Sequence, residues 1–121
     1  MAEIKTKKYG DILFYIDENE IKDKKYGKTL FYIDGVEIKE DSKYGKTKFY
    51  IAGNEIRQEN KYGNVLYFFD GKELRTKSRY GNIKYYIDGN EIKENGKYGN
   101  VEYFIDGSLS EIQLYAFLSI T

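Results

Sequence analysis

The dipeptide Tyr-Gly constrains the fold of this chain more than any other feature, because it returns six times at a nearly constant interval. The intervals are 17, 18, 18, 18 and 18 residues, between Tyr9, Tyr26, Tyr44, Tyr62, Tyr80 and Tyr98. Such a period is typical of repeat proteins, whose short units bury a core only by packing on their neighbours. The 121 residues therefore form one tandem-repeat domain, with a half repeat at 3–8, repeats at 9–25, 26–43, 44–61, 62–79, 80–97 and 98–107, and a capping segment at 108–121.

Each unit predicts one β-hairpin. In the fifth unit, residues 83–88 and residues 91–93 flank Gly89-Asn90, a two-residue loop that favours a tight primed turn. The first unit has Glu18-Asn19 instead, so its turn is less ideal. Successive hairpins of this kind predict an all-β antiparallel meander of about twelve short strands.

The hairpin turn also decides which side chains share a face of the sheet, because side chains alternate along a strand. Ile87 faces Ile92 across the turn, and the residues two and four back, Tyr85 and Ile83, are expected on the same apolar face. This face needs a cover, since each buried side chain of this size contributes roughly 1.5–3 kcal/mol.

The second face is expected to be solvated and to pair an aromatic ring with a cation in every complete unit. Five further charged residues are expected on this face as well: Lys28, Lys46, Lys48, Lys84 and Glu102. The candidate binding residues are the rings Tyr15, Tyr32, Tyr50, Phe68, Tyr86 and Phe104 and the cations Lys22, Lys39, Arg57, Arg75 and Lys93. Rows of exposed rings can hold sugars or extended chains, and the alternative is cross-strand packing that shields the sheet.

The two ends of the repeat array complement each other. Glu3-Ile4-Lys5 matches the second strand of a unit without its first strand, and the sixth unit stops at Gly107 without a second strand. Either residues 3–5 pair with residues 101–105 and close a ring or barrel, or the sheet is open as a single sheet or solenoid. In both cases Ile4 should lie on the apolar face.

Residues 108–121 break the repeat and fit two periods. Ile112, Leu114, Ala116 and Leu118 alternate as in a strand, but Ser108-Leu-Ser-Glu111 resembles a helix capping box. The cap favours a C-terminal helix that covers the apolar face or an open end.

Composition excludes several kinds of chemistry. The chain has no Cys and no His, which removes thiolates, the commonest general base near neutral pH and the commonest zinc ligand. We expect a non-catalytic protein with no metal and no cofactor. The net charge of zero argues against a nucleic-acid partner. With no signal peptide and no long apolar run, we expect no membrane insertion and a cytoplasmic location by default.

Two further motifs have alternative interpretations. Facing carboxylates could bind calcium or accept turn N–H groups, at Asp17/Glu20, Asp34/Glu37, Asp70/Glu73 and Asp88/Glu91. The Tyr-Gly dipeptides are interpreted as structural, with the tyrosine packed between successive hairpins and the glycine relaxing the turn. The asparagines after three of these glycines are expected to bond the turn backbone: Asn64, Asn82 and Asn100.

The segments Val65-Leu-Tyr-Phe-Phe-Asp-Gly-Lys-Glu-Leu and Gly81-Asn-Ile-Lys-Tyr-Tyr-Ile-Asp-Gly resemble the choline-binding and glucan-binding repeats of bacterial surface proteins and clostridial toxins. This resemblance implies stacked hairpins in a solenoid that binds cell-wall choline or polysaccharide, with Tyr86 and Phe104 among the strand aromatics. The present unit is shorter, and the Trp on which those repeats depend is absent.

These observations lead to two functional hypotheses. The first is a non-catalytic binding module that presents its aromatic and cationic face to an extended partner, either a protein or a cell-surface glycan. The second is a purely structural scaffold or a subunit that self-assembles into a homo-oligomer through its sheet edges.

Overall fold

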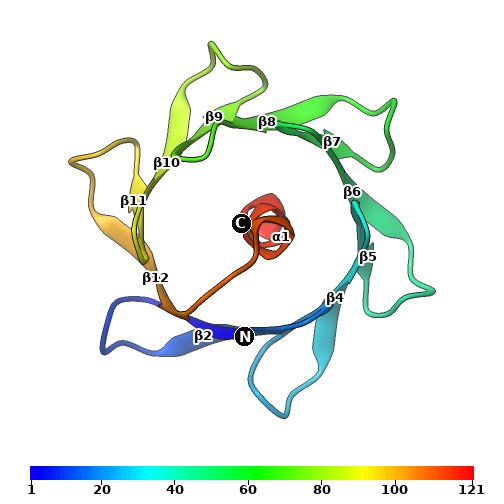
Figure 1. The fold of residues 1–121 in the computed structure, drawn as a ribbon, viewed down its shortest axis with the longest axis horizontal. Helices are drawn as coiled ribbons and strands as arrows, with labels where there is room; N and C mark the ends of the chain where they lie inside the picture. The colour runs from blue at the N-terminus through cyan, green and yellow to red at the C-terminus, as the bar shows by residue number, and fades with distance from the viewer.

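The computed structural model describes all 121 residues and contains twelve β-strands followed by one helix, α1 (Glu111–Ile120). Figure 1 shows the strands as a ring around this helix. In chain order the strands are β1 (Ala2–Lys5), β2 (Ile12–Asp17), β3 (Glu20–Lys22), β4 (Thr29–Asp34), β5 (Glu37–Glu40), β6 (Thr47–Ala52), β7 (Glu55–Gln58), β8 (Val65–Phe69), β9 (Glu73–Thr76), β10 (Ile83–Asp88), β11 (Glu91–Glu94) and β12 (Val101–Gly107).

The sheet is a closed antiparallel barrel in which the first strand joins the last. β1 pairs with β12 on one side, with Ile4 opposite Ile105, and with β2 on the other, with Ile4 opposite Phe14. The opening half repeat therefore supplies the strand that the sixth unit lacks. Of the two alternatives that the sequence left open, the structure shows the closed ring. Closure also sets the fold apart from the open solenoid of stacked hairpins that the resemblance implied.

The tight turns inside each unit form where the sequence predicts them. The first turn residue has a positive φ, 63° at Gly35 and 60° at Gly89, a conformation that glycine adopts without steric cost. Glu18 takes a similar φ of 51° in the first unit, at the position identified as less ideal. The expected pairs across the turns are present, for example Ile87 with Ile92 and Tyr86 with Lys93.

The apolar face of the barrel points inward and is covered by α1, which lies along the axis of the ring (Figure 1). The helix side chains Ala116, Phe117 and Leu118 are fully buried. Around them lies a layer of fully buried strand residues: Ile4, Ile16, Ile21, Ile38, Ile56, Leu74 and Ile92. The tail is thus the helix that the capping pattern favoured, and it fills the barrel.

The helix begins two residues later than the sequence pattern suggested. Ser110, and not Ser108, is the N-cap, and its hydroxyl accepts a hydrogen bond from the Gln113 backbone N–H. The Gln113 side-chain oxygen accepts a hydrogen bond from the Ser110 N–H, and its amide nitrogen donates one to the Glu18 carbonyl oxygen in the first tight turn. The cap therefore fixes α1 to the end of the barrel that carries the tight turns.

A β-bulge in the first strand of every unit changes the expected faces. Ile83 lies opposite Arg75 and Tyr85 lies opposite Leu74, so Lys84 is an extra residue between two pairs. Ile83 is therefore on the outer face, and the expectation that it joins the apolar face was wrong. The bulge residue Lys84 was expected on the outer face with the candidate cations. It instead contacts the inner Tyr67 and the end of α1, so that expectation was wrong as well.

Candidate functional site

Six loops connect the units and project outward from the barrel like petals (Figure 1). We call them petal loops, and they comprise residues 6–11, 23–28, 41–46, 59–64, 77–82 and 95–100. One backbone hydrogen bond closes the base of each, such as the 2.9 Å bond from the Gln58 N–H to the Asn64 carbonyl. In four of the loops, from the third to the sixth, a second bond ties the loop to the bulge, as from the Glu59 N–H to the Lys48 carbonyl at 2.9 Å. The petal loops are therefore anchored structures.

In four of the six petal loops the glycine of Tyr-Gly is required by close packing against backbone atoms, at Gly45, Gly63, Gly81 and Gly99, whereas at Gly10 and Gly27 the nearest atoms belong to side chains. A Cβ atom on Gly45 would lie 1.7 Å from the carbonyl oxygen of Glu40, and one on Gly63 would lie 1.7 Å from that of Gln58. Because these neighbours are backbone atoms, they cannot move aside as a flexible side chain would. The interpretation of the glycine as structural agrees with this geometry. The reason is the close contact with the backbone, and not an unusual φ angle.

The tyrosine of Tyr-Gly does not pack between hairpins, and that interpretation was wrong. The six side chains are 84–93 % exposed, at Tyr9, Tyr26, Tyr44, Tyr62, Tyr80 and Tyr98. The backbone N–H of Tyr62 is held by the Asn60 side chain at 2.8 Å, and Ser42 and Ser78 bond the equivalent tyrosines at 3.2 Å. Asn64 was expected to bond the turn backbone. It does so through its backbone carbonyl oxygen, which accepts the hydrogen bond from the Gln58 N–H.

Each exposed ring is preceded in sequence by a cation. The charge lies over the ring in five loops, with distances to the ring centroid of 5.6 Å for Lys8, 5.6 Å for Lys25, 5.1 Å for Lys61, 5.5 Å for Arg79 and 5.8 Å for Lys97. Exposed cation–π contacts are worth about 0.5–1 kcal/mol. None of these cations takes part in the ion pairs of the protein. Every petal loop thus presents an aromatic ring and a positive charge to solvent.

The structure places the sequence-predicted binding rings on the outer wall of the barrel, between the petal loops and the tight turns. Most are half-buried, and Tyr15 is only 5 % exposed. Each ring lies opposite the predicted cation on one side and a glutamate on the other, as Tyr32 lies between Lys39 and Glu20. Ring closure gives Phe104 the partner that sequence reasoning missed, Lys5 of β1.

The wall cations are held in ion pairs with neighbouring carboxylates. Lys39 Nζ lies 2.7 Å from Asp34 and Arg57 lies 2.6 Å from Glu55. The hydrogen bond from Lys39 lowers the pKa of Asp34 and raises the pKa of Lys39. These cations also donate to petal-loop carbonyls, Arg57 to Lys61 at 2.8 Å and Lys39 to Lys43 at 3.1 Å. The wall cations therefore stabilise the petal loops through these hydrogen bonds, whereas the petal-loop cations are directed to solvent.

The facing carboxylates at the tight turns are engaged by the protein itself. Asp70 accepts hydrogen bonds from the N–H groups of Lys72 and Glu73, and the Glu73 N–H in particular lowers the pKa of Asp70. Asp88 bonds Lys93 at 3.0 Å. No three acidic side chains come together as a metal cage would require.

At the petal-loop end of the barrel the bulge residues surround the end of α1. Lys84 Nζ donates to the Tyr67 hydroxyl and to the Thr121 carbonyl, both at 3.0 Å. This places a positive charge at the negative end of the helix dipole. Beside them a hydrogen bond with Glu94 raises the pKa of Glu102, and burial raises the pKa of Tyr85.

The fold and the loops define a class of protein: a closed barrel of six hairpin units around a central helix, with six equivalent loops at its rim. The chain belongs to the family described as 6-fold beta flower protein, whose model matches residues 3–117.

Neither the curated proteins nor the solved structures searched gave a match to this chain. The protein has no helix that is both long enough and apolar enough to cross a membrane.

Proposed function

We propose that this protein is a non-catalytic binding module whose six petal loops together hold an extended, anionic glycan. The observation that supports this most strongly is the 84–93 % exposure of the tyrosine at the same place in all six loops. An exposed ring contributes little to folding, because it removes little apolar surface from water. Its repetition is better explained by contact with a partner.

The chemistry of each loop tip fits an acidic sugar chain. A tyrosine face packs against the C–H face of a sugar ring, and the adjacent lysine or arginine attracts a carboxylate, sulfate or phosphate group. Six weak contacts joined in one molecule give high avidity to a partner that repeats, since later contacts form at high effective concentration.

A glycan fits better than single-stranded nucleic acid, which also uses rings and cations. Nucleic-acid grooves carry a continuous positive potential, whereas here the net charge is zero and acidic side chains pair with the wall cations between the loops. The outer-wall residues predicted from the sequence remain a secondary part of the surface in this proposal, because they are half-buried and paired.

The alternative, a self-assembling scaffold, is less well supported. Every strand is paired on both sides in the closed ring, so no free edge remains for the strand pairing that the sequence left open. The absence of His and Cys and the sixfold repetition of the loops favour a non-catalytic role.

The test is a six-site variant with serine at Tyr9, Tyr26, Tyr44, Tyr62, Tyr80 and Tyr98. Affinity electrophoresis would be run through gels containing polygalacturonate, alginate, hyaluronan or heparin, with neutral dextran as the reference. We expect at least one acidic polysaccharide to retard the native protein, and the six-site variant to migrate as it does in dextran.

A matched wall variant, with serine at Tyr32, Tyr50 and Tyr86, carries aromatic changes outside the petal loops. It should keep most of the retardation. Retention of binding by the six-site variant, or its loss only in the wall variant, would contradict the proposal. So would preference for a single-stranded oligonucleotide over every acidic polysaccharide.

A further inference from the structure

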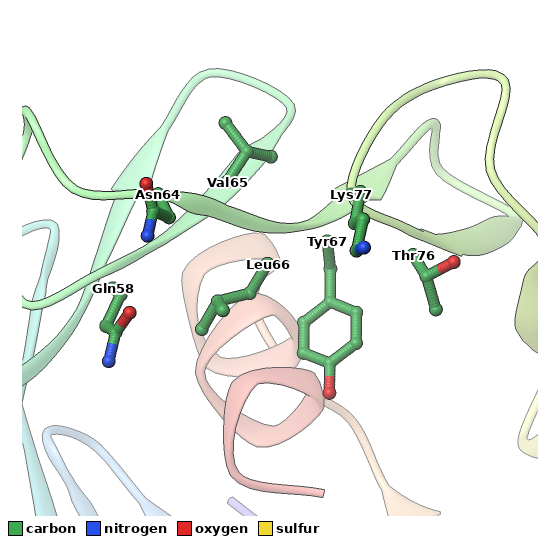
Figure 2. A pocket seen from close by; sticks show the side chains of 7 residues that line it. All are labelled: Gln58, Asn64, Val65, Leu66, Tyr67, Thr76 and Lys77. Atoms are coloured by element: carbon green, nitrogen blue, oxygen red, sulfur yellow. The ribbon is translucent and has the colours of Figure 1, made fainter.

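Beyond the six equivalent loops, one place in the barrel departs from sixfold symmetry. A cavity of about 600 Å³ opens at the petal-loop end beside β8 and β9, and four other surface cavities measure about 280–370 Å³. Figure 2 shows its lining: Gln58, Asn64, Val65, Leu66, Tyr67, Thr76 and Lys77. A cavity of this size is in the range of sites for small molecules.

The β-bulge at Leu66 gives this cavity its shape. Because Arg57 pairs with Val65 and Ile56 pairs with Tyr67, Leu66 is the extra residue. Leu66 and Tyr67 consequently point to the same side of β8, toward the end of α1, and Val65 points to the other (Figure 2). An aliphatic side chain and an aromatic ring thus stand next to each other on one wall.

Equivalent positions in neighbouring units are closed by charged side chains. In the preceding unit Lys48 pairs with Glu40 at 3.3 Å. In the following unit Lys84 occupies the bulge position and bonds Tyr67 and Thr121. Between them the same positions carry Leu66 and the uncharged Gln58 and Thr76. No ion pair closes this place, so the cavity stays open.

Apart from Lys77, the polar groups that line the cavity are neutral and available to a ligand. Of its side chains only Tyr67 is hydrogen-bonded, and its hydroxyl accepts that bond from Lys84, which leaves the hydroxyl proton free to donate. Two amides, from Gln58 and Asn64, can donate and accept, and the hydroxyl of Thr76 can do both. No carboxylate lines the cavity.

From this arrangement we infer that the cavity beside Tyr67 binds a neutral saccharide of one or two rings. The C–H face of the sugar packs on Tyr67 and Leu66, and its hydroxyl groups pair with the amides of Gln58 and Asn64 and with Thr76. This site is single. Two cations are near it, Lys77 in its lining and Lys84, whose Nζ lies over the Tyr67 ring at 4.7 Å from the centroid, so the sugar packs on the ring from the other side. The site is therefore distinct from the six cationic loop tips proposed to hold a glycan chain.

The experiment is a titration of the ¹⁵N-labelled protein with D-glucose, D-galactose, N-acetyl-D-glucosamine and cellobiose, followed by NMR. The side-chain amide signals of Gln58 and Asn64 report on the cavity directly. At least one saccharide should shift both signals in a saturable way, with little change at the petal-loop tyrosines.

The deciding variant is Leu66→Lys, which places in the cavity the residue found at the equivalent position of two other units. Its fold should be kept, and its saccharide affinity should fall by at least ~10-fold, or 1.4 kcal/mol. Leu30→Lys makes the same change in a unit outside the cavity and should leave the affinity unchanged. Absence of saturable shifts with all four saccharides, or equal binding by Leu66→Lys, would overturn the inference.

The same variants separate this site from the proposed glycan surface. Leu66→Lys should still be retarded by acidic polysaccharide, whereas the six-site serine variant should still bind the small saccharide. Joint loss of both activities in the Leu66→Lys variant would show that the cavity is not an independent site, and would overturn the inference.

Discussion

At the scale of single residues, the Tyr-Gly dipeptide combines two neighbours with opposite environments. Tyr44 is 91 % exposed, whereas the Cα hydrogen of Gly45 faces the Glu40 carbonyl oxygen so closely that no side chain fits. The repeat was visible in the sequence, but the orientation of the tyrosine was not, because a loop residue has no alternating pattern that marks its face. The apolar character of tyrosine suggested burial, and the structure shows the reverse.

The first prediction separates the two residues of this dipeptide. Tyr44→Ser should change the free energy of unfolding by less than about 0.5 kcal/mol, as is usual for exposed positions. Gly45→Ala should cost about 1–3 kcal/mol, because the backbone must move to admit the Cβ atom. Urea unfolding of the two variants measures both values, and equal stability of the two would contradict the assignment.

The second prediction concerns the carboxyl pair at the petal-loop end. The hydrogen bond with Glu94 raises the pKa of Glu102, so the folded state holds its proton more tightly than the unfolded state. The stability contributed by this pair is present below the unfolded pKa of Glu102, near 4.5, and is lost as pH rises through the folded pKa. Glu102→Gln should therefore raise the melting temperature at neutral pH, and the gain should vanish in acid.

Asp34→Asn is the control of opposite sign for this pH dependence. Lys39 lowers the pKa of Asp34, so its contribution is present above the unfolded pKa and is lost as pH falls through the folded one. This variant should be less stable than the native protein at neutral pH and approach it in acid. Thermal melts of both variants from acid to neutral pH would test the two signs together.

At the scale of secondary-structure elements, the hairpins were predictable and the bulges were not. Alternation correctly paired Ile87 with Ile92, because one buried face fixes the register. The extra residue at Lys84 shifts the rest of the strand by one position, which moves Ile83 outward. Nothing in the composition of the strand marks this insertion, because both apolar and charged residues occupy the bulge: Leu13, Leu30, Lys48, Leu66, Lys84 and Glu102.

The helix was predictable as an element, and its position on the barrel axis followed only from closure. A third prediction tests its central contact, where the fully buried Phe117 meets the edges of Phe14 at 5.8 Å and Tyr103 at 5.2 Å between ring centroids. Phe117→Ala should cost about 3–5 kcal/mol. Ile112→Ala, at a half-buried position of the same helix, should cost clearly less in the same urea titration. A smaller loss for Phe117→Ala than for Ile112→Ala would contradict the packing described here.

At the scale of the whole molecule, ring closure depends on one short strand, β1. The half-repeat phase of β1 was the only sequence signal for closure. It left the open sheet as an alternative, because the same half unit could also stand at the end of an open array. Function had no comparable signal, since six copies of one loop indicate a repeated surface but contain no motif specific to a ligand.

The fourth prediction tests closure through Ile4, which is fully buried between Ile105 and Phe14. Ile4→Asp should cost about 3–5 kcal/mol, as expected for an unpaired charge in a core. Lys8→Asp introduces the same side chain on a petal loop and should be nearly neutral. Hydrogen exchange gives an independent measurement, because the amides of β1 should be as protected as those of β11. Exchange at β1 as fast as in an unfolded peptide would contradict closure.

The pairing of β1 with β12 has a consequence for how the protein matures during its synthesis. Ala2 meets Gly107, and the helix that fills the barrel follows still later in the chain. During synthesis β1 therefore leaves the ribosome long before β12, its second partner, has been made. Until α1 follows, the apolar faces of the five complete hairpins remain uncovered. Contacts of such long sequence separation form late, so the ring can close only once β12 has been made, and α1 then completes the core.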